Sequence, residues 1–218
     1  MNLQDYIIND ITPFNVDASI KEVQVVFNQL TYSHVPVKKD GIYLGCINET
    51  DAYCFEGENT LQDYQYSLEP FFVRHTTNWL DVLEAFAQNN SNIMPVLGKD
   101  NKYIGYYELG DVMNLFNDTP FLSEAGGIII VEKGIHDYSF SEICQIIESN
   151  DTKILGVFIS KLENDIMQAT IKIGHAGMNA IVQTFRRYSY NVVSSHEEDL
   201  FVDDLRKRSN YLDKYLNM

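Results

Sequence analysis

The chain contains the same structural unit twice, and this internal repeat limits its fold more than any other feature. Residues 33–53 align with residues 92–113 at an offset of 59 to 60 positions. The aligned pairs include two prolines, two glycines and two aspartates, namely Pro36 with Pro95, Gly45 with Gly105 and Asp51 with Asp111. Upstream, three apolar residues align in the same way, namely Ile20 with Trp79, Val23 with Val82 and Phe27 with Phe86. The match therefore covers a whole structural unit and not one short motif.

Each unit is predicted to run helix, strand, turn, strand, helix. Ser19 followed by Glu22 forms a capping box, and apolar residues then recur at helical spacing. Asn78 takes the capping position in the second copy. A short apolar strand follows at residues 34–37 and again at 93–97, and a polar turn leads to a second strand that ends in the repeated glycine. A second helix is expected just after that glycine.

This pattern resembles the CBS domain, which combines a His/Ile-x-Pro-Val strand, a hairpin and a Gly-h-h-x-x-x-Asp segment that leads into a helix. Two copies in tandem resemble a CBS pair, or Bateman module, over residues 1–118, with the copies at about 1–60 and 61–118. The resemblance implies that the copies pack sheet to sheet about a pseudo-twofold axis, with ligand clefts between them. It also implies a non-catalytic, regulatory role and assembly into a homodimer.

The repeat stops near residues 118–126, and the remaining chain shows a different order of elements. Residues 126–195 are predicted to run strand, helix, strand, strand, helix, strand, which is the ferredoxin-like βαββαβ order. This segment resembles an ACT domain, and the combination resembles the acetoin-utilisation AcuB-type proteins. We therefore predict an α/β (α+β) fold class with a tandem CBS pair followed by a ferredoxin-like, ACT-like domain. Residues 196–218 are predicted to form an acidic loop and an amphipathic tail helix.

The CBS resemblance implies a site for an adenosine-containing ligand at the pattern Gly-h-h-Thr/Ser-x-x-Asp. Its glycine lets the backbone pass close to the ligand, its hydroxyl residue caps a helix whose N-terminus attracts phosphate, and its aspartate accepts the ribose hydroxyls. Asp51 and Asp111 keep the aspartate position. Asn48 takes the hydroxyl position in the first copy and can still cap a helix. Glu108 takes it in the second copy, where its carboxylate would select against phosphate.

We therefore expect a ligand to bind with the first copy and to carry little phosphate, such as adenosine, AMP or S-adenosylmethionine rather than ATP. The resemblance places the adenine beside Thr12, Val35 or Met94. The alternative is that both clefts are degenerate and empty, because an aspartate near a helix N-terminus is common as a capping residue. The chain would then act as a ligand-free module for dimerisation or protein interaction.

In the ACT-like half, the resemblance implies an effector site at the turn of residues 134–138, usually across a dimer interface. The small residue often found before the helix is replaced here by Tyr138, Ser139 and Phe140. These replacements argue against a pocket for an amino-acid backbone. We therefore expect this domain to serve dimerisation.

The charge balance argues against a nucleic-acid binder, because 16 Lys and Arg face 31 Asp and Glu and the net charge is −15. Such an acidic surface favours an unidentified protein partner with a basic face. No apolar run is long enough to span a membrane, and the first residues lack a signal-peptide pattern. We therefore expect no membrane association and a cytoplasmic location.

The reactive residue types form no pattern that indicates an enzyme, a cofactor or a metal site. Cys46, Cys54 and Cys144 lack paired spacing, and the five histidines are scattered. Ser194, Ser195, His196 and Glu197 are adjacent catalytic residue types, but neighbours along one strand point to opposite faces, so they do not predict a catalytic triad. We expect no enzymatic activity and only a regulatory ligand.

Overall fold

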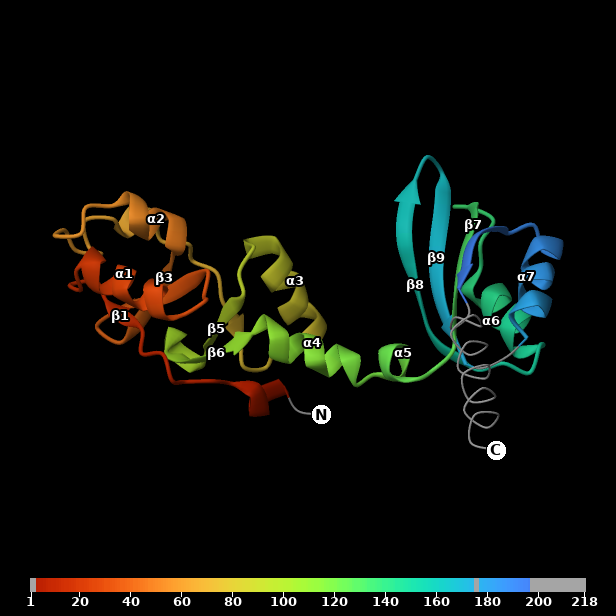
Figure 1. The fold of residues 1–218 in the computed structure, drawn as a ribbon, viewed down its shortest axis with the longest axis horizontal. Coiled ribbons are helices and arrows are strands. Elements are labelled where there is room, and N and C mark those ends of the chain that lie inside the picture. Colours follow the sequence, from red (N-terminus) through yellow and green to blue (C-terminus); the bar gives the residue numbers. More distant parts are fainter. Residues whose placement is uncertain (1–2, 175–176, 197–218) are drawn as a thin grey trace, which may run out of the picture. The chain divides into compact units, whose positions relative to one another are not determined.

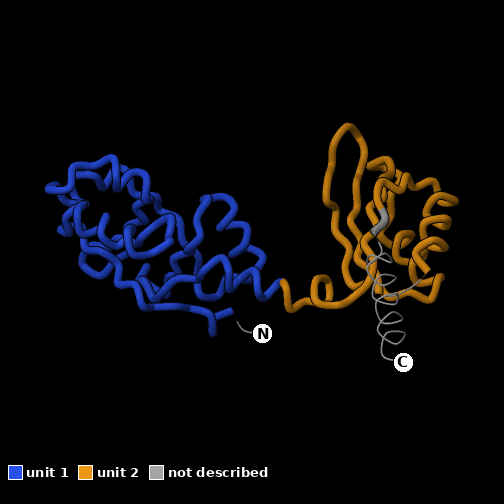
Figure 2. Tube along the Cα trace, viewed as in Figure 1, with its two compact units in different colours: residues 1–116 blue, residues 117–218 orange. Residues whose placement is uncertain are grey.

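The computed structural model describes residues 3–174 and 177–196 and divides the chain into two compact units, residues 1–116 and 117–218 (Figure 2). The last described strand ends at His196. Residues 197–218, to which we assigned most of the acidic loop and the tail helix, therefore lie outside the described residues. No described helix has the length and apolar character needed to cross a bilayer.

The first repeat has the predicted helix and hairpin, preceded by a short strand that the sequence did not predict (Figure 1). Its elements are η1 (Leu3–Tyr6), β1 (Phe14–Asn15), α1 (Ile20–Gln29), β2 (His34–Lys39), β3 (Ile42–Asn48) and α2 (Glu49–Cys54). The capping box at α1 is confirmed, because the Glu22 amide donates to Ser19 Oγ and the Ser19 amide donates to Glu22 Oε2. Helix α1 buries the three predicted apolar residues Ile20, Val23 and Phe27.

The second repeat follows the same plan. Its elements are η2 (Gln65–Ser67), β4 (Val73–Arg74), α3 (Trp79–Asn89), β5 (Ile93–Leu97), η3 (Lys99–Asn101), β6 (Tyr103–Glu108) and α4 (Leu109–Asn117). The predicted cap is confirmed, because Asn78 Oδ1 accepts from the Leu80 and Asp81 amides. In each repeat the short first strand pairs in parallel with the second, and the second pairs antiparallel with the third. The two sheets therefore have the same topology.

The segment that leads into each repeat pairs with the sheet of the other repeat, so the two leader segments are exchanged. The Ile8 backbone pairs with Tyr106 on β6 of the second repeat, and the Glu69 backbone pairs with Cys46 on β3 of the first. The two repeated glycines lie beside these backbone pairings, Gly45 next to Glu69 and Gly105 next to Ile8. Their φ angles are +157° at Gly45 and +154° at Gly105. A Cβ at these positions would lie 2.9 Å from the Glu69 carbonyl oxygen and 2.4 Å from the Ile8 carbonyl oxygen. In this structure the glycines thus admit the exchanged backbone, where we had expected them to admit a ligand.

The cores of the two repeats share this connection. The first repeat has its own apolar core around Ile20, Val35 and Ile47. The core of the second repeat, around Phe86, Met94 and Tyr107, also includes Tyr43 and Cys46 from β3 of the first. Because one core contains side chains of both repeats, the repeats support each other's folding.

The second unit has the predicted βαββαβ order and confirms the ferredoxin-like topology. Its elements are α5 (Pro120–Ser123), β7 (Gly127–Gly134), α6 (Phe140–Glu148), β8 (Ile154–Glu163), β9 (Ile166–Ile173), α7 (Met178–Arg187) and β10 (Asn191–His196). The strands form one antiparallel sheet in the order β10-β7-β9-β8. Helices α6 and α7 cover the same face of this sheet (Figure 1). Strand β9 alternates strictly, with Met167, Ala169, Ile171 and Ile173 buried beneath the helices.

Candidate ligand site

The first repeat brings Asn48 and Asp51 together at the start of α2, as the motif predicts. Asn48 Oδ1 accepts a 2.7 Å hydrogen bond from the Asp51 amide and thereby caps the helix. Asn48 Nδ2 lies 3.3 Å from Asp51 Oδ2. Both residues are half-buried. Asn48 therefore uses its side-chain oxygen for the cap and turns its amide group toward carboxylates, so a ligand at this position would have to compete for that amide.

Glu69, which the motif does not include, completes this group. Its Oε1 accepts a 2.8 Å hydrogen bond from Asn48 Nδ2 and lies 3.5 Å from His34 Nε2. Burial lowers the pKa of His34, and the carboxylates of Glu69 and Asp51 act in the opposite direction. Glu69 adds negative charge to that of Asp51 and so disfavours a phosphate near Asn48. It reaches this place through the exchanged leader segment, which no sequence motif reveals.

In the second repeat the equivalent residue is Glu108, and the hydroxyl groups of two tyrosines lie near it. Glu108 Oε1 accepts a 2.6 Å hydrogen bond from the Tyr32 hydroxyl, which lies 3.0 Å from the Tyr106 hydroxyl. The Tyr106 hydroxyl in turn donates a 2.6 Å hydrogen bond to Asp10 Oδ1. Burial raises the pKa of both tyrosines, and so do the hydrogen bond to Glu108 at Tyr32 and the hydrogen bond to Asp10 at Tyr106. The residue aligned with Tyr32 in the other repeat is Ser91, which is too short to cover Asn48 in the same way.

The remaining predicted site residues are not gathered around one cleft in this structure. Val35 and Met94 are fully buried in the cores of their own repeats, so neither presents a side-chain surface to an adenine. Thr12 is exposed in the loop before β1. Asp111 is half-buried in the first turn of α4, and its carboxylate has no hydrogen-bond partner among the described residues. The structure thus brings together Asn48 and Asp51 but leaves the adenine position undefined.

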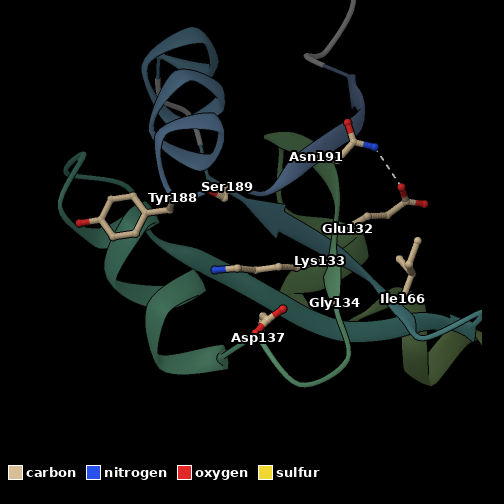
Figure 3. Close-up of a pocket in the computed structure, with 8 residues that line it drawn as sticks. All are labelled: Glu132, Lys133, Gly134, Asp137, Ile166, Tyr188, Ser189 and Asn191. Carbon is tan, nitrogen blue, oxygen red and sulfur yellow. Dashed lines mark hydrogen bonds between the residues drawn. The ribbon is translucent and has the colours of Figure 1, made fainter.

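The second unit contains a hollow of about 610 Å³ at the predicted effector turn (Figure 3). It is lined by Gly134 and Asp137, where β7 leads into α6, and by Tyr188 and Ser189, where α7 leads into β10. This volume falls within the range of small-molecule pockets. We had expected no pocket for an amino-acid backbone at this turn, because Tyr138, Ser139 and Phe140 are large or polar. None of these three residues is among those that line the hollow.

Two charged side chains of this hollow are already paired. Glu132 accepts 3.0 Å hydrogen bonds from Gln168 Nε2 and Asn191 Nδ2. Lys133 Nζ lies 2.7 Å from Glu142 Oε2 and 4.2 Å from the centre of the Tyr190 ring. Over residues 3–174 and 177–196, no group of three or more His, Cys, Asp or Glu residues is placed to hold a metal ion.

Comparison with known proteins finds a family match for the second repeat. Residues 63–118 match the family model of the CBS domain. A comparison with curated proteins finds no match. A CBS domain pair/ACT domain protein from Thermotoga maritima is 18% identical, with a TM-score of 0.48, over 53% of this chain and 96% of its own length. The CBS domains of a transcriptional regulator from Streptococcus pneumoniae are 16% identical, with a TM-score of 0.47, over 52% of this chain and 98% of theirs.

Proposed function

We propose that the chain is a non-catalytic regulatory protein whose repeat pair binds an adenosine-containing small molecule at the first repeat. The observation that carries this proposal is the pairing of Asn48 with Asp51 at the cap of α2, which keeps the aspartate at the position where the CBS resemblance implies ribose binding. The match of the second repeat to the CBS family supports the same assignment for the aligned first repeat.

The charges near Asn48 define the preferred ligand. Glu69 lies against Asn48, and Glu49 and Asp51 belong to the first turn of α2. Like charges at about 4 Å repel by roughly 4 kcal/mol at an effective dielectric constant of 20. We therefore propose adenosine or S-adenosylmethionine as better ligands than AMP, and AMP as a better ligand than ATP.

The test is the thermal stability of the full chain with adenosine, S-adenosylmethionine, AMP, ADP, ATP or NAD at fixed ionic strength. A ligand at about 100 times its Kd stabilises the protein by roughly 2.7 kcal/mol, which is a clear rise in Tm. Asp51→Ala is expected to abolish the response, and the matched variant Asp111→Ala is expected to keep it. A response that depends on Asp111 and not on Asp51 would contradict the assignment to the first repeat.

A second candidate function is a ligand-free module for dimerisation and protein interaction. The observation in its favour is that Tyr32 covers Glu108 while Val35 and Met94 are fully buried, so none of these three residues is open to a ligand. This function predicts a homodimer by sedimentation whose assembly and partner binding persist in Asp51→Ala/Asp111→Ala. No rise in Tm with any of the six compounds would favour it over the ligand-binding function.

A further inference from the structure

His34 lies between the contact that joins the two repeats and the cap of α2. The side chain is buried, with 5% of its surface exposed, and packs edge-on against the Phe71 ring at 5.1 Å between centroids. Its Nδ1 lies 2.8 Å from Ser33 Oγ, and its Nε2 lies 3.5 Å from Glu69 Oε1. Glu69 in turn accepts from Asn48 at the cap. One imidazole ring therefore connects two hydrogen-bonded groups on opposite sides.

One of the contacts between the repeats is made by two aligned residues, Ser33 and Asn92. The Ser33 amide donates to Asn92 Oδ1 at 2.8 Å, and the Asn92 amide donates to Ser33 Oγ at 3.0 Å. Asn92 Nδ2 also donates to the Thr31 carbonyl oxygen at 2.7 Å. These reciprocal bonds tie the start of β2 to the start of β5, so a change in the Ser33 hydroxyl acts directly on the junction of the repeats.

The Ser33 hydroxyl has one proton and two acceptors within reach. Its Oγ lies 2.8 Å from His34 Nδ1 and 3.0 Å from Asn92 Oδ1. When His34 is neutral with its proton on Nε2, Nδ1 accepts a hydrogen bond from the Ser33 hydroxyl. When His34 is protonated, Nδ1 becomes a donor to Ser33 Oγ, and the Ser33 proton can only turn to Asn92 Oδ1. Both arrangements satisfy the donors without any movement of the heavier atoms.

The charged groups that act on His34 are both acidic. Glu69 comes from the segment before β4, and Asp51 comes from α2. A protonated ring would form an ion pair with Glu69 on its Nε2 side, in competition with the hydrogen bond from Asn48 Nδ2. Protonation of His34 would therefore have two effects. It would favour the hydrogen bond from the Ser33 hydroxyl to Asn92 Oδ1, and it would draw Glu69 away from Asn48 at the cap of α2.

We propose that His34 is a proton switch that links the junction of the two repeats to the candidate ligand site. The neutral ring accepts a hydrogen bond from the Ser33 hydroxyl, whereas the protonated ring donates to Ser33 Oγ and the Ser33 hydroxyl then donates to Asn92 Oδ1. This inference concerns the ligand-free chain and does not depend on the proposed ligand.

The test is a pH titration of the histidine ring nitrogens by NMR in the full chain, with the exposed His136 of the other unit as an internal reference. The expected neutral form of His34 has its proton on Nε2. Ser33→Ala is expected to lower the pKa of His34, because the charged ring loses the stronger of the two hydrogen bonds. Ser33→Thr keeps the hydroxyl and is expected to restore the pKa of the unmodified chain.

Asn92→Ala provides the decisive variant. The Asn92 side chain stabilises protonated His34 only indirectly, by accepting the hydrogen bond from the Ser33 hydroxyl. Loss of the Asn92 acceptor is expected to lower the pKa of His34 and to leave that of His136 unchanged. An unchanged His34 pKa in a folded Asn92→Ala protein would overturn the proposal. So would a neutral His34 with its proton on Nδ1, and that measurement needs only the unmodified chain.

Discussion

The Tyr32 hydroxyl donates a 2.6 Å hydrogen bond to Glu108 Oε1, from the loop before β2 of one repeat to the end of β6 in the other. The aligned pair, Ser91 and Asn48, makes no such bond, because the Ser91 hydroxyl donates to the Ile93 carbonyl oxygen. The two repeats share a topology but not a site. Divergence at these two positions places a tyrosine over Glu108, whereas Asn48 has no covering tyrosine and instead donates to Glu69.

Tyr32→Phe removes this hydrogen bond while keeping the aromatic ring. We expect a loss of about 1.5 kcal/mol in the free energy of unfolding, since the acceptor is a carboxylate. Urea denaturation of the full chain measures this loss. Tyr66→Phe is the control, because Tyr66 is 81% exposed and its change should have no measurable effect. Equal stability of the Tyr32→Phe protein and the unmodified chain would show that the Tyr32–Glu108 bond contributes nothing to stability.

Gly105→Ala tests the exchange of the leader segments. A Cβ at Gly105 would lie 2.4 Å from the Ile8 carbonyl oxygen, and φ is +154°. We expect a loss of more than about 2 kcal/mol in the free energy of unfolding, together with faster amide exchange at Ile8 and Tyr106. Hydrogen exchange measured by mass spectrometry reports on this segment.

Gly110→Ala is the matched control in the helix that follows. Nothing lies within 4 Å of a Cβ at Gly110, which is part of α4. Alanine favours a helix over glycine by about 0.5–1 kcal/mol, so this variant is expected to be as stable as the unmodified chain or more stable. If the two alanine variants behaved alike, close approach of Ile8 would not be the reason for the glycine at position 105.

The elements that the sequence predicted correctly are those fixed by nearby residues. The caps at Ser19 and Asn78 are set within three residues, and the alternation of β9 is set by its own side chains. Strands β1 and β4 contain two residues each, too few to show a period. Their pairing depends on the parallel neighbour in the sheet, which a local pattern does not contain.

The candidate site was predicted only where it lies within one motif. Asn48 and Asp51 are three residues apart and meet at a helix cap, so their contact follows from the sequence. Glu69 and Tyr32 reach the sites from the other repeat, and their contacts depend on how the repeats are joined. Val35 and Met94 are fully buried because their strands are covered on both faces, which a short apolar run alone does not establish.

Acid is expected to weaken the second unit through Glu142. The hydrogen bond from Lys133 and, to a lesser extent, Tyr190 hold the pKa of Glu142 below its ordinary value of 4.5. Because the folded pKa is below the unfolded one, this interaction stabilises the fold above pH 4.5 and is lost as the pH falls through the folded pKa. Glu142→Gln should lower the free energy of unfolding by about 0.5 kcal/mol at pH 7 and have little effect at pH 2.

The control for Glu142 is Glu163→Gln, which removes a surface pair with Lys161. The Glu163 side chain is 62% exposed, so its ion pair is screened by water. Urea denaturation at pH 7 and pH 2 compares both variants with the unmodified chain. A Glu142→Gln protein that lost as much stability at pH 2 as at pH 7 would show that the effect comes from packing and not from the charge.

Phe121 and Gly156 are expected to be energetically coupled, because their contact holds α5 on the sheet. The Phe121 ring fills the space above Gly156, where a Cβ would lie 2.3 Å from Phe121 Cδ2, and it also contacts Phe158 at 5.7 Å between ring centroids. Phe121→Ala should lower the free energy of unfolding by about 1.5 kcal/mol, because the contacts of the half-buried ring are lost.

Gly156→Ala should displace the same ring and speed proteolysis near α5. Because either change removes the same contact, the double variant should lose about 0.5–1 kcal/mol less than the sum of the single losses. Strictly additive losses would show that the ring and the glycine stabilise the unit independently.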